Sequence, residues 1–414
     1  MTAPARPVPP AFAWADSLFT YGVTGTNGKT STCALISACL RAEGRHVMTV
    51  GTTGAFIDEQ PVPKGTNYAE FTAAIERGKD AGCRDLVIEA TSLGLARGYA
   101  RKWRFDLGVF TNLSPDHLKT HGTWENYLAA KAQLFMHLGP GRTMVLNAAC
   151  RYATFIDQAT PADVQRRWFR VPSRGPAHAT PDLEAAAVTV DARGTTVTLA
   201  PSAWAQALGS VLRVGMVGEV YAENALAAAA ACLSQGVAPE AIVRGLAQCP
   251  AVPGRFEVLA HTPTVVVDYA HSPDALERTC DTARAIVRGQ GQGRGRVIVV
   301  FGAGGGATPQ KRGPMGVAVA RRADAAVITT DNPRHEEPAA IAEMIAAGMR
   351  EVDGGASFEI ILDRRAAIEH AIAQAGVDDV VVVAGRGHET TQRIGDRLVP
   401  LSDAREVRRI TGQG

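Results

Sequence analysis

A glycine-rich segment near the start of the chain has the residue types and spacing of a phosphate-binding loop. Residues 21–32 read YGVTGTNGKTST, and the apolar residues 18–23 lead into a turn that ends in Gly28-Lys29-Thr30. A strand, a glycine-rich turn and a helix in that order let backbone N–H groups and a helix N-terminus face an anion. The lysine then reaches phosphate oxygens and the threonine hydroxyl binds Mg²⁺. The predicted nucleotide-binding residues are Gly25, Thr26, Asn27, Gly28, Lys29, Thr30 and Ser31.

The loop is a variant, because Val23 stands where the usual first glycine would be. Its alternative interpretation is an ordinary turn between a strand and a helix. The Gly-Lys-Thr sequence with correct flanks favours the phosphate-binding interpretation.

Three more residues have side chains that could complete a nucleotide and metal site. Glu89 ends an apolar segment, His117 follows another, and Lys131 lies in a segment with helical character. In open α/β sheets, side chains at strand ends face the ligand crevice. Each residue also has an ordinary alternative: a helix cap for Glu89, a loop histidine bonded to backbone for His117, and a solvated helix side chain for Lys131.

The elements around these residues alternate between strand-like and helix-like segments, which predicts an α/β fold with a mostly parallel sheet. A turn cluster at residues 252–256 suits an interdomain linker, and a second α/β rhythm follows it. Residues 185–214 are rich in Val and Thr and predict added antiparallel strands. The predicted domains are a flexible arm at 1–14, a nucleotide-binding domain at 15–253 and a second domain at 254–414.

Composition is that of an ordinary globular protein, with 46% hydrophobic and 20% charged residues. A net charge of +2 gives no indication of nucleic acid or an anionic membrane as a partner. The chain has no apolar run of membrane-spanning length and no signal-peptide core at its start. The seven cysteines form no CxxC pair, so we interpret them as buried thiols of a cytoplasmic protein.

Several further motifs make the chain similar to the Mur ligase family, and most of all to its MurE branch of tripeptide synthetases. The similarity extends from Tyr21 to Ile410. The motifs, in the family's order, are GVTGTNGKTST at 22–32, VFTNLSPDHLKTHGTWENYLAAKAQLF at 109–135, VPGRFEVL at 252–259, VVVDYAHSPDAL at 265–276, VFGAGGGATPQKRGPMG at 300–316, TTDNPRHEEP at 329–338, LDRRAAI at 362–368 and VVVAGRGHETTQ at 381–392.

This resemblance implies a P-loop NTPase-like central domain followed by a Rossmann-like C-terminal domain. It implies that Lys29 and Thr30 hold ATP phosphates and Mg²⁺, and that Glu89 and His117 belong to the metal site. Lys131 matches the family's carbamylated lysine, whose added carboxylate is an oxygen ligand of the type that hard cations prefer. The positions that match the family's nucleotide and linker contacts are Asn224, Arg255, Asp268, Tyr269 and His271.

The implied reaction is ADP-forming amide synthesis through an acyl phosphate, with ATP and Mg²⁺. The implied partners are a small-molecule, peptide or carrier-borne carboxylate and an amino acid or amine, for a monomer or weak dimer. A folylpolyglutamate- or cyanophycin-synthetase-like ligase that adds amino acids repeatedly is a second hypothesis. A non-catalytic ATP-binding partner of another Mur-like enzyme is a third.

The residues at the positions that bind the acceptor acid in the family differ in this chain. Only the residues before Tyr21 precede the loop, whereas MurE-type proteins carry there a uridine-nucleotide-binding domain of roughly a hundred residues. The acceptor-lining positions fall on Thr66, Thr91, Ser92 and Arg97, with Leu93 in place of a family histidine and Tyr99 in place of an arginine. We therefore expect an acceptor without UDP, or one that a partner protein presents.

The residues that bind the amine substrate in the family are only partly present in this chain. Asn332 and Arg334 match the motif that grips an amino-acid carboxylate, and a planar guanidinium suits that contact. Gly385 and Glu389 match positions at the distal end of the amino acid. One family arginine is missing from Gly304-Gly305-Gly306-Ala307-Thr308, so we expect an amine bearing a carboxylate, with diaminopimelate a candidate but not the favoured one. The alternative for Arg334 is a structural salt bridge.

Overall fold

The computed structural model describes residues 12–65, 67–114, 121–289, 294–306 and 309–413. The chain divides into two compact units. The first contains Met1–Thr189, Thr195–Gly215 and Glu219–Cys249, and the second contains Val190–Gly194, Met216–Gly218 and Pro250–Gly414. His117 and Thr66 lie outside the described residues, so their predicted roles remain predictions.

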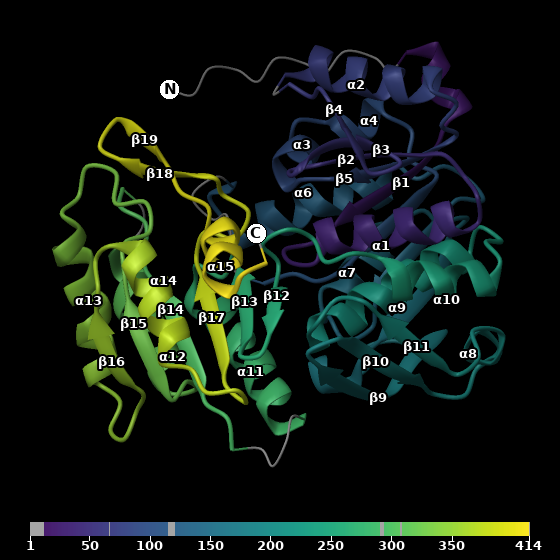
Figure 1. The fold of residues 1–414 in the computed structure, drawn as a ribbon. Coiled ribbons are helices and arrows are strands. Elements are labelled where there is room, and N and C mark those ends of the chain that lie inside the picture. The colour runs from purple at the N-terminus through teal and green to yellow at the C-terminus, as the bar shows by residue number, and fades with distance from the viewer. Residues whose placement is uncertain (1–11, 66, 115–120, 290–293, 307–308, 414) are drawn as a thin grey trace. The chain divides into compact units, whose positions relative to one another are not determined.

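The first unit is built on one large sheet with the strand order β11-β10-β9-β8-β7-β6-β1-β5-β2-β3-β4 (Figure 1). Its strands are β1 (Phe19–Thr24), β2 (Val47–Gly51), β3 (Gly54–Ile57), β4 (Gln60–Val62), β5 (Asp85–Glu89), β6 (Leu107–Phe110), β7 (Thr143–Asn147), β8 (Gln165–Arg170), β9 (Leu183–Asp191), β10 (Gly194–Leu199) and β11 (Val211–Val214).

The middle of this sheet is parallel, as predicted. Strand β1 pairs in parallel with both β5 and β6, which places Val23 opposite Glu89 and Thr24 opposite Phe110. The carboxyl ends of these three strands therefore meet at one edge, where the phosphate loop follows β1 and Glu89 ends β5. Antiparallel pairing occurs between β10 and β11, as predicted for that region, and also in β2-β3-β4, which the sequence did not indicate.

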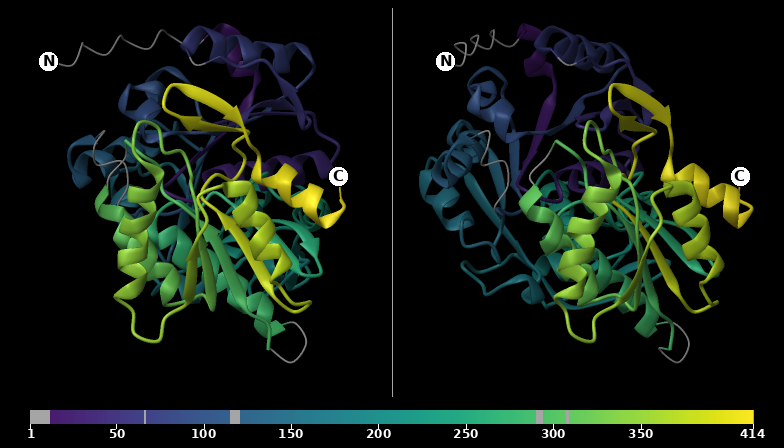
Figure 2. Two further views of the ribbon diagram at one scale, coloured as in Figure 1. Left: turned by 60° about the vertical axis from the view of Figure 1, so that its left-hand side comes forward. Right: turned by 90° about the vertical axis from the view of Figure 1, so that its left-hand side faces the viewer.

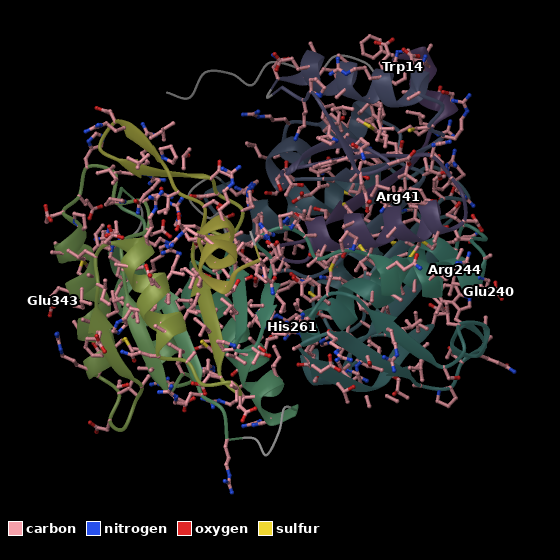
Figure 3. All side chains as sticks on the ribbon, viewed as in Figure 1. Trp14, Arg41, Glu240, Arg244, His261 and Glu343 are labelled. Atoms are coloured by element: carbon pink, nitrogen blue, oxygen red, sulfur yellow. The ribbon has the colours of Figure 1, made fainter. Side chains whose placement is uncertain are left out.

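Helices cover both faces of this sheet. They are α1 (Lys29–Ala42), α2 (Tyr68–Asp80), α3 (Ser92–Ala96), α4 (Tyr99–Lys102), α6 (Trp124–Met136), α7 (Ala153–Ala159), α8 (Ala203–Ala207), α9 (Glu219–Leu233) and α10 (Pro239–Gln248). Helix α1 packs against α9 and α10. Figure 3 labels Arg41 on α1 and Arg244 on α10, and Arg244 donates to the carbonyl oxygen of Ala42 at 3.0 Å. A hydrophobic core joins buried side chains of α2, α6 and α7 with those of the sheet.

The second unit has a smaller sheet with the order β12-β13-β17-β14-β15-β16. Its strands are β12 (Glu257–His261), β13 (Thr264–Asp268), β14 (Val297–Phe301), β15 (Ala325–Ile328), β16 (Ser357–Ile360) and β17 (Val380–Ala384). All neighbours pair in parallel except β12, which is an antiparallel edge strand. The helices are α11 (Pro273–Gly289), α12 (Arg312–Ala320), α13 (Pro338–Arg350), α14 (Arg364–Ala373) and α15 (Asp403–Thr411).

A two-stranded hairpin of β18 (Thr391–Ile394) and β19 (Arg397–Pro400) follows β17. In Figure 2 this yellow hairpin projects from one end of the second unit's sheet. Its first strand meets the segment after β15 through a parallel bridge between Arg334 and Ile394. The hairpin is thus attached to a segment that carries predicted amine-site residues. Within the described residues, no helix combines the length and apolarity needed to cross a bilayer.

We expect Gly245→Ala to destabilise the first unit, because α10 touches the backbone of α1 at this glycine. An alanine Cβ there would lie 2.5 Å from the Cα atom of Cys39 and 2.7 Å from the carbonyl oxygen of Ala38. Overpacking of this kind costs about 1–3 kcal/mol. Thermal unfolding followed by circular dichroism should therefore show a lower midpoint.

Gly313→Ala is the matched control, since Gly313 lies in helix α12 and the nearest atom to its added Cβ is 3.9 Å away. An equal loss of stability in both variants would show that close helix contact at Gly245 is not the cause.

Candidate active site

The phosphate loop connects β1 to α1, and two of its positions favour glycine. A Cβ at Gly25 would lie 1.9 Å from Oγ1 of Thr111, and a Cβ at Gly28 would lie 2.3 Å from Oδ1 of Asn224. Gly28 also has a φ of 83°, in the left-handed region that disfavours other residues. The loop backbone is therefore in contact with β6 on one side and α9 on the other.

The residues after β6 hold this backbone by hydrogen bonds. Thr26 N donates to the carbonyl oxygen of Asn112 at 2.8 Å, and Asn27 N donates to Oδ1 of Asn112 at 3.0 Å. Thr111 Oγ1 donates to the carbonyl oxygen of Asn27 at 2.6 Å. Sequence reasoning gave no role to Thr111 and Asn112. Their position at the end of a strand next to β1 was the available signal.

Two lysines converge on one carbonyl group of the loop. Nζ of Lys29 donates to the carbonyl oxygens of Gly25 at 3.1 Å and Thr26 at 2.8 Å. Nζ of Lys131 donates to the same Gly25 oxygen at 2.6 Å and lies 4.5 Å from the centre of the Tyr127 ring. Lys131 is 1% exposed, which excludes the solvated alternative for this residue. Lys29 thus brings positive charge to the loop, and Lys131 is close enough to the loop for an oxygen ligand carried on its nitrogen to reach the same place.

Glu89 is held beside the loop by hydroxyl and amide donors rather than by a helix end. Its Oε2 accepts from Oγ1 of Thr30 at 3.1 Å and from N and Oγ1 of Thr52 at 3.0 and 2.9 Å. Thr52 was missed at the sequence level, although it follows the end of β2. A hydroxyl and a carboxylate in contact form a donor set of the oxygen type that Mg²⁺ takes, so these residues fit the implied metal.

Lys64 lies close to the same carboxylate. Its ammonium group donates to the carbonyl oxygen of Gly51, the residue before Thr52. Burial lowers the pKa of Lys64 from its ordinary value, while the negative charge of Glu89 opposes that shift. Lys64 thus adds a partly desolvated cation near the loop that sequence reasoning did not identify.

A buried polar chain starts at the residue before Asn224 on α9. The neighbouring Glu223 accepts from Nδ2 of Asn147 at 2.8 Å and from Arg174 at 3.3 Å. Asn147 also donates to the carbonyl oxygen of Thr111 at 2.7 Å. This chain connects α9 to the ends of β6 and β7, close to the two residues that contact the phosphate loop, Thr111 and Asn224.

The predicted acceptor residues follow β5. Thr91 caps α3 by accepting from N of Gly94 at 3.2 Å, and Oγ of Ser92 lies 3.0 Å from Nε2 of His121. Arg97 is exposed at the end of α3. Thr91 therefore has a structural role whatever else it contacts, and His121 is a polar neighbour that the sequence did not single out.

The cysteines take no part in this site. All seven are free thiols, and every one except Cys150 is buried. Burial raises the pKa of Cys249 and of Cys280 to about 12. Such thiols stay protonated and unreactive near neutral pH.

In the second unit, the predicted nucleotide-facing residues form one group at the end of β13. Oδ2 of Asp268 accepts from N of Phe256 at 2.7 Å, and Oδ1 accepts from Oγ1 of Thr279 at 2.9 Å. The guanidinium of Arg255 lies 4.7 Å from the centre of the Tyr269 ring. His271 donates through Nδ1 to the carbonyl oxygen of Tyr269 at 2.8 Å.

The predicted amine-binding residues also come together. Nδ2 of Asn332 donates to Oε2 of Glu389 at 2.8 Å. A Cβ at Gly385 would lie 2.6 Å from Oδ2 of Asp331, so this position needs glycine. Arg334 has a φ of 54° and donates to the carbonyl oxygen of Gly305 at 2.6 Å. Among the described residues Arg334 has no carboxylate partner, which does not favour the salt-bridge alternative.

The hairpin fixes the backbone of Arg334. N of Arg334 donates to the carbonyl oxygen of Arg393 at 3.1 Å, and N of Gly395 donates to the carbonyl oxygen of Arg334 at 2.5 Å. The glycine-rich segment before it packs on the same turn, since a Cβ at Gly305 would lie 1.9 Å from the carbonyl oxygen of Pro333. The hairpin and the glycine-rich segment thus hold Arg334 between them at its unusual φ.

A buried ionic group lies under this turn. Asp403, with 0% exposure, accepts from Nε and Nη2 of Arg364, both at 2.8 Å. Arg386, also 0% exposed, donates to Oδ1 of Asn332 at 3.1 Å and lies 3.8 Å from Asp403. Burial alone would lower the pKa of Arg364, but Asp403 raises it above its ordinary value. Sequence reasoning missed all three residues.

Comparison with known proteins finds one family domain in each of two successive parts of the chain. The model of the Mur ligase middle domain matches residues 23–232, and that of the Mur ligase glutamate ligase domain matches residues 254–387. The chain belongs to the Mur ligase family. This confirms the family, the α/β fold class and the enzyme class, acid–amino-acid ligase, that the motifs predicted. The domain boundaries and the site residues stay predictions.

Two relatives in the family are named UDP-N-acetylmuramoyl-L-alanyl-D-glutamate–2,6-diaminopimelate ligases. The one from Geobacillus kaustophilus is 35% identical, over 92% of this chain and 76% of its own. The one from Ralstonia nicotianae is 38% identical, over 95% and 76%. A solved structure of a ligase with that name has a TM-score of 0.69 at 31% identity, over 96% of this chain and 79% of its own.

The fold is also that of a more distant ligase. Mycobacterium tuberculosis folylpolyglutamate synthase, solved with ADP and AMPPCP, has a TM-score of 0.69 over 90% of this chain and 89% of its own. At 19% identity this likeness concerns the fold alone.

We expect Asp403→Asn to destabilise the second unit of this Mur ligase family member strongly. The substitution leaves Arg364 and Arg386 buried without their shared carboxylate, and breaking a buried ion pair costs about 3–5 kcal/mol. Denaturant unfolding monitored by circular dichroism should show a transition at lower concentration.

Asp353→Asn, at an exposed aspartate, serves as the control and should leave the transition unchanged. If Asp403→Asn behaved like this control, the buried ionic group would not be what stabilises the turn around Asn332.

Proposed function

We propose that the chain is an ATP-dependent, ADP-forming ligase that joins a carboxylate to an amine through an acyl phosphate. The observation that carries the proposal is the group formed by Lys29, Lys131, Thr30 and Glu89 at the phosphate loop. Both lysines donate to Gly25, and Glu89 accepts from Thr30 at 3.1 Å. Membership of the Mur ligase family supports the same reaction class.

In the first step a carboxylate oxygen of the acceptor attacks the γ-phosphorus of ATP. The new C–O–P bond forms while the bond between that phosphorus and the β-phosphate oxygen breaks, and ADP leaves. Positioned positive charge is the main requirement of phosphoryl transfer, and Lys29 supplies it beside the loop. Thr30, Glu89 and a carbamylated Lys131 are the residues proposed to hold Mg²⁺, which would neutralise charge on the transferred phosphate.

In the second step the amine nitrogen attacks the acyl carbon. A tetrahedral intermediate forms, the C–O bond to phosphate breaks, and the nitrogen loses a proton as the amide forms. Water competes with the amine at this stage, so a ligase must exclude it. The proposed amine-binding residues are Asn332, Arg334, Gly385 and Glu389.

We further propose that the acceptor acid lacks a UDP group. Tyr99, which replaces a family arginine, lies within an aromatic cluster, 5.3 Å from Phe71 and 6.3 Å from Trp103 between ring centres. It therefore offers no cation to a sugar–peptide substrate. Leu93, in place of a family histidine, is 42% exposed and offers no hydrogen bond. The relatives are named for a UDP-linked acceptor, so the difference is one of substrate within the family.

We expect Lys131→Ala and Glu89→Gln each to lower the rate of phosphate release at least about a hundredfold, as loss of a preorganised charge at a transition state does. The assay supplies ATP, Mg²⁺, an amino acid and a panel of acids with and without UDP, and mass spectrometry identifies the product. ADP binding, measured in parallel, should persist in both variants and so separate lost chemistry from lost folding.

Glu125→Gln, at an exposed glutamate on α6, is the control and should keep full activity. Preference for the UDP-linked dipeptide acceptor would contradict the proposed acceptor while leaving the ligase reaction intact. Products extended by several copies of one amino acid would favour the folylpolyglutamate- or cyanophycin-synthetase-like hypothesis. Activity retained in Lys131→Ala would contradict the catalytic proposal itself.

We expect Arg334→Lys to raise KM for the amine about tenfold or more with a smaller change in kcat. An ammonium cannot make the two parallel hydrogen bonds that a guanidinium makes to a carboxylate. Steady-state kinetics with varied amine concentration test this.

Arg393→Lys is the matched control, because Arg393 is exposed and bonds the turn through its backbone. Equal KM values for parent and Arg334→Lys would remove Arg334 from the proposed amine site.

A further inference from the structure

A hollow lined by cations lies at the amino ends of β6 and β7 in the first unit. Two segments line it, residues 100–104 before β6 and residues 137–142 before β7, around a cavity of about 570 Å³. Strand β1 runs parallel to β6, and the phosphate loop follows the carboxyl end of β1. The hollow is therefore at the opposite edge of the sheet from the nucleotide site.

The lining is strongly positive. Its titratable side chains are Arg101, Lys102, Arg104, His137 and Arg142, and the described residues that line it include no acid. The chain as a whole has a net charge of only +2, so this concentration of cations is local. Burial, together with the positive charge of Arg101, lowers the pKa of His137 from its ordinary value.

Nearby acids compensate only part of this charge. The buried Asp106 forms ion pairs with Arg142 at 2.6 Å and with Arg104 at 3.4 Å, and it accepts a hydrogen bond from N of Thr20 at 2.7 Å. One carboxylate therefore serves two guanidinium groups as well as a backbone amide. Arg104 has a second partner, the exposed Asp16, at 3.5 Å. Arg101 and Lys102 form no ion pair within the part of the chain that the structure describes.

The cations are carried by a rigid frame. Trp103, between Lys102 and Arg104, is 1% exposed and stacks on Tyr99 with ring centres 6.3 Å apart. Trp14, labelled in Figure 3, packs edge-on against it at 6.2 Å. Nε1 of Trp103 donates to Oγ1 of Thr20 at 3.3 Å. A ligand would thus meet cations whose backbone is already ordered, which lowers the entropic cost of binding.

We propose that this hollow is a binding site for a small polyanion with two or more phosphate groups, separate from the nucleotide site. Guanidinium groups bind phosphate oxygens in pairs, and several adjacent cations match a ligand with several charges. A cavity of about 570 Å³ is within the range of small-molecule sites and exceeds the size of one phosphate. The proposal does not depend on the reaction that the chain catalyses.

Tripolyphosphate is the probe, added to the chain at fixed ionic strength with the phosphate loop saturated by ADP. Calorimetry should detect binding that Arg101→Ala/Lys102→Ala weakens at least about tenfold, as expected for the loss of two charge-assisted contacts. A bound anion favours the imidazolium form, so NMR titration should show that tripolyphosphate raises the pKa of His137 in the parent. The double variant should not show that rise.

Arg193→Ala/Arg213→Ala is the matched control, because it removes two exposed cations outside the hollow and should keep the parent affinity within about twofold. Arg101→Gln alone is the second variant, for use if the double variant folds poorly. It should weaken tripolyphosphate binding by a smaller factor than the double variant. Equal losses in the hollow variants and the control, or no binding to the parent, would overturn the proposal. Tighter binding of a single-stranded oligonucleotide than of tripolyphosphate would overturn it in favour of nucleic acid.

Discussion

The first unit depends on one steric constraint: the backbone of the phosphate loop lies in contact with side chains from two other elements. Thr111 and Asn224 occupy the space that a Cβ at Gly25 or Gly28 would need. The loop backbone therefore packs directly against the residue after β6 and against α9, with no room for a side chain at either glycine. Lys29 and Lys131 meet at the carbonyl oxygen of Gly25, and Glu89 reaches Thr30 from the end of β5.

Sequence reasoning could predict the parts of this site that have a local signature. The Gly-Lys-Thr turn, the apolar strand that ends in Glu89 and the position of Lys131 in a family motif are all visible along the chain. A parallel sheet places consecutive strand ends at one edge, so their proximity could be expected as well. The mostly parallel sheets in both units and the antiparallel β10-β11 pair agree with that reasoning.

The parts that escaped prediction act through partners far away in sequence. Thr52 matters because it donates to Glu89, and Asn147 matters because it joins Thr111 to Glu223. Asp403 resembles an ordinary acid in the first turn of a helix, yet it balances Arg364 and Arg386 in the interior. No local pattern reveals such pairings, since they exist only once distant strands and helices have packed.

The backbone attachment of Arg334 has a consequence for how the amine specificity could change during evolution. Two main-chain groups of the hairpin, the carbonyl oxygen of Arg393 and N of Gly395, hold this residue, and the hairpin side chains Leu398 and Val399 are exposed. Amino acids in the hairpin can therefore be exchanged while the guanidinium stays in position. With Arg334 in its proposed amine role, substitutions at exposed hairpin positions such as Leu398 and Val399 would let descendants of this sequence sample new amines without first losing the proposed carboxylate contact.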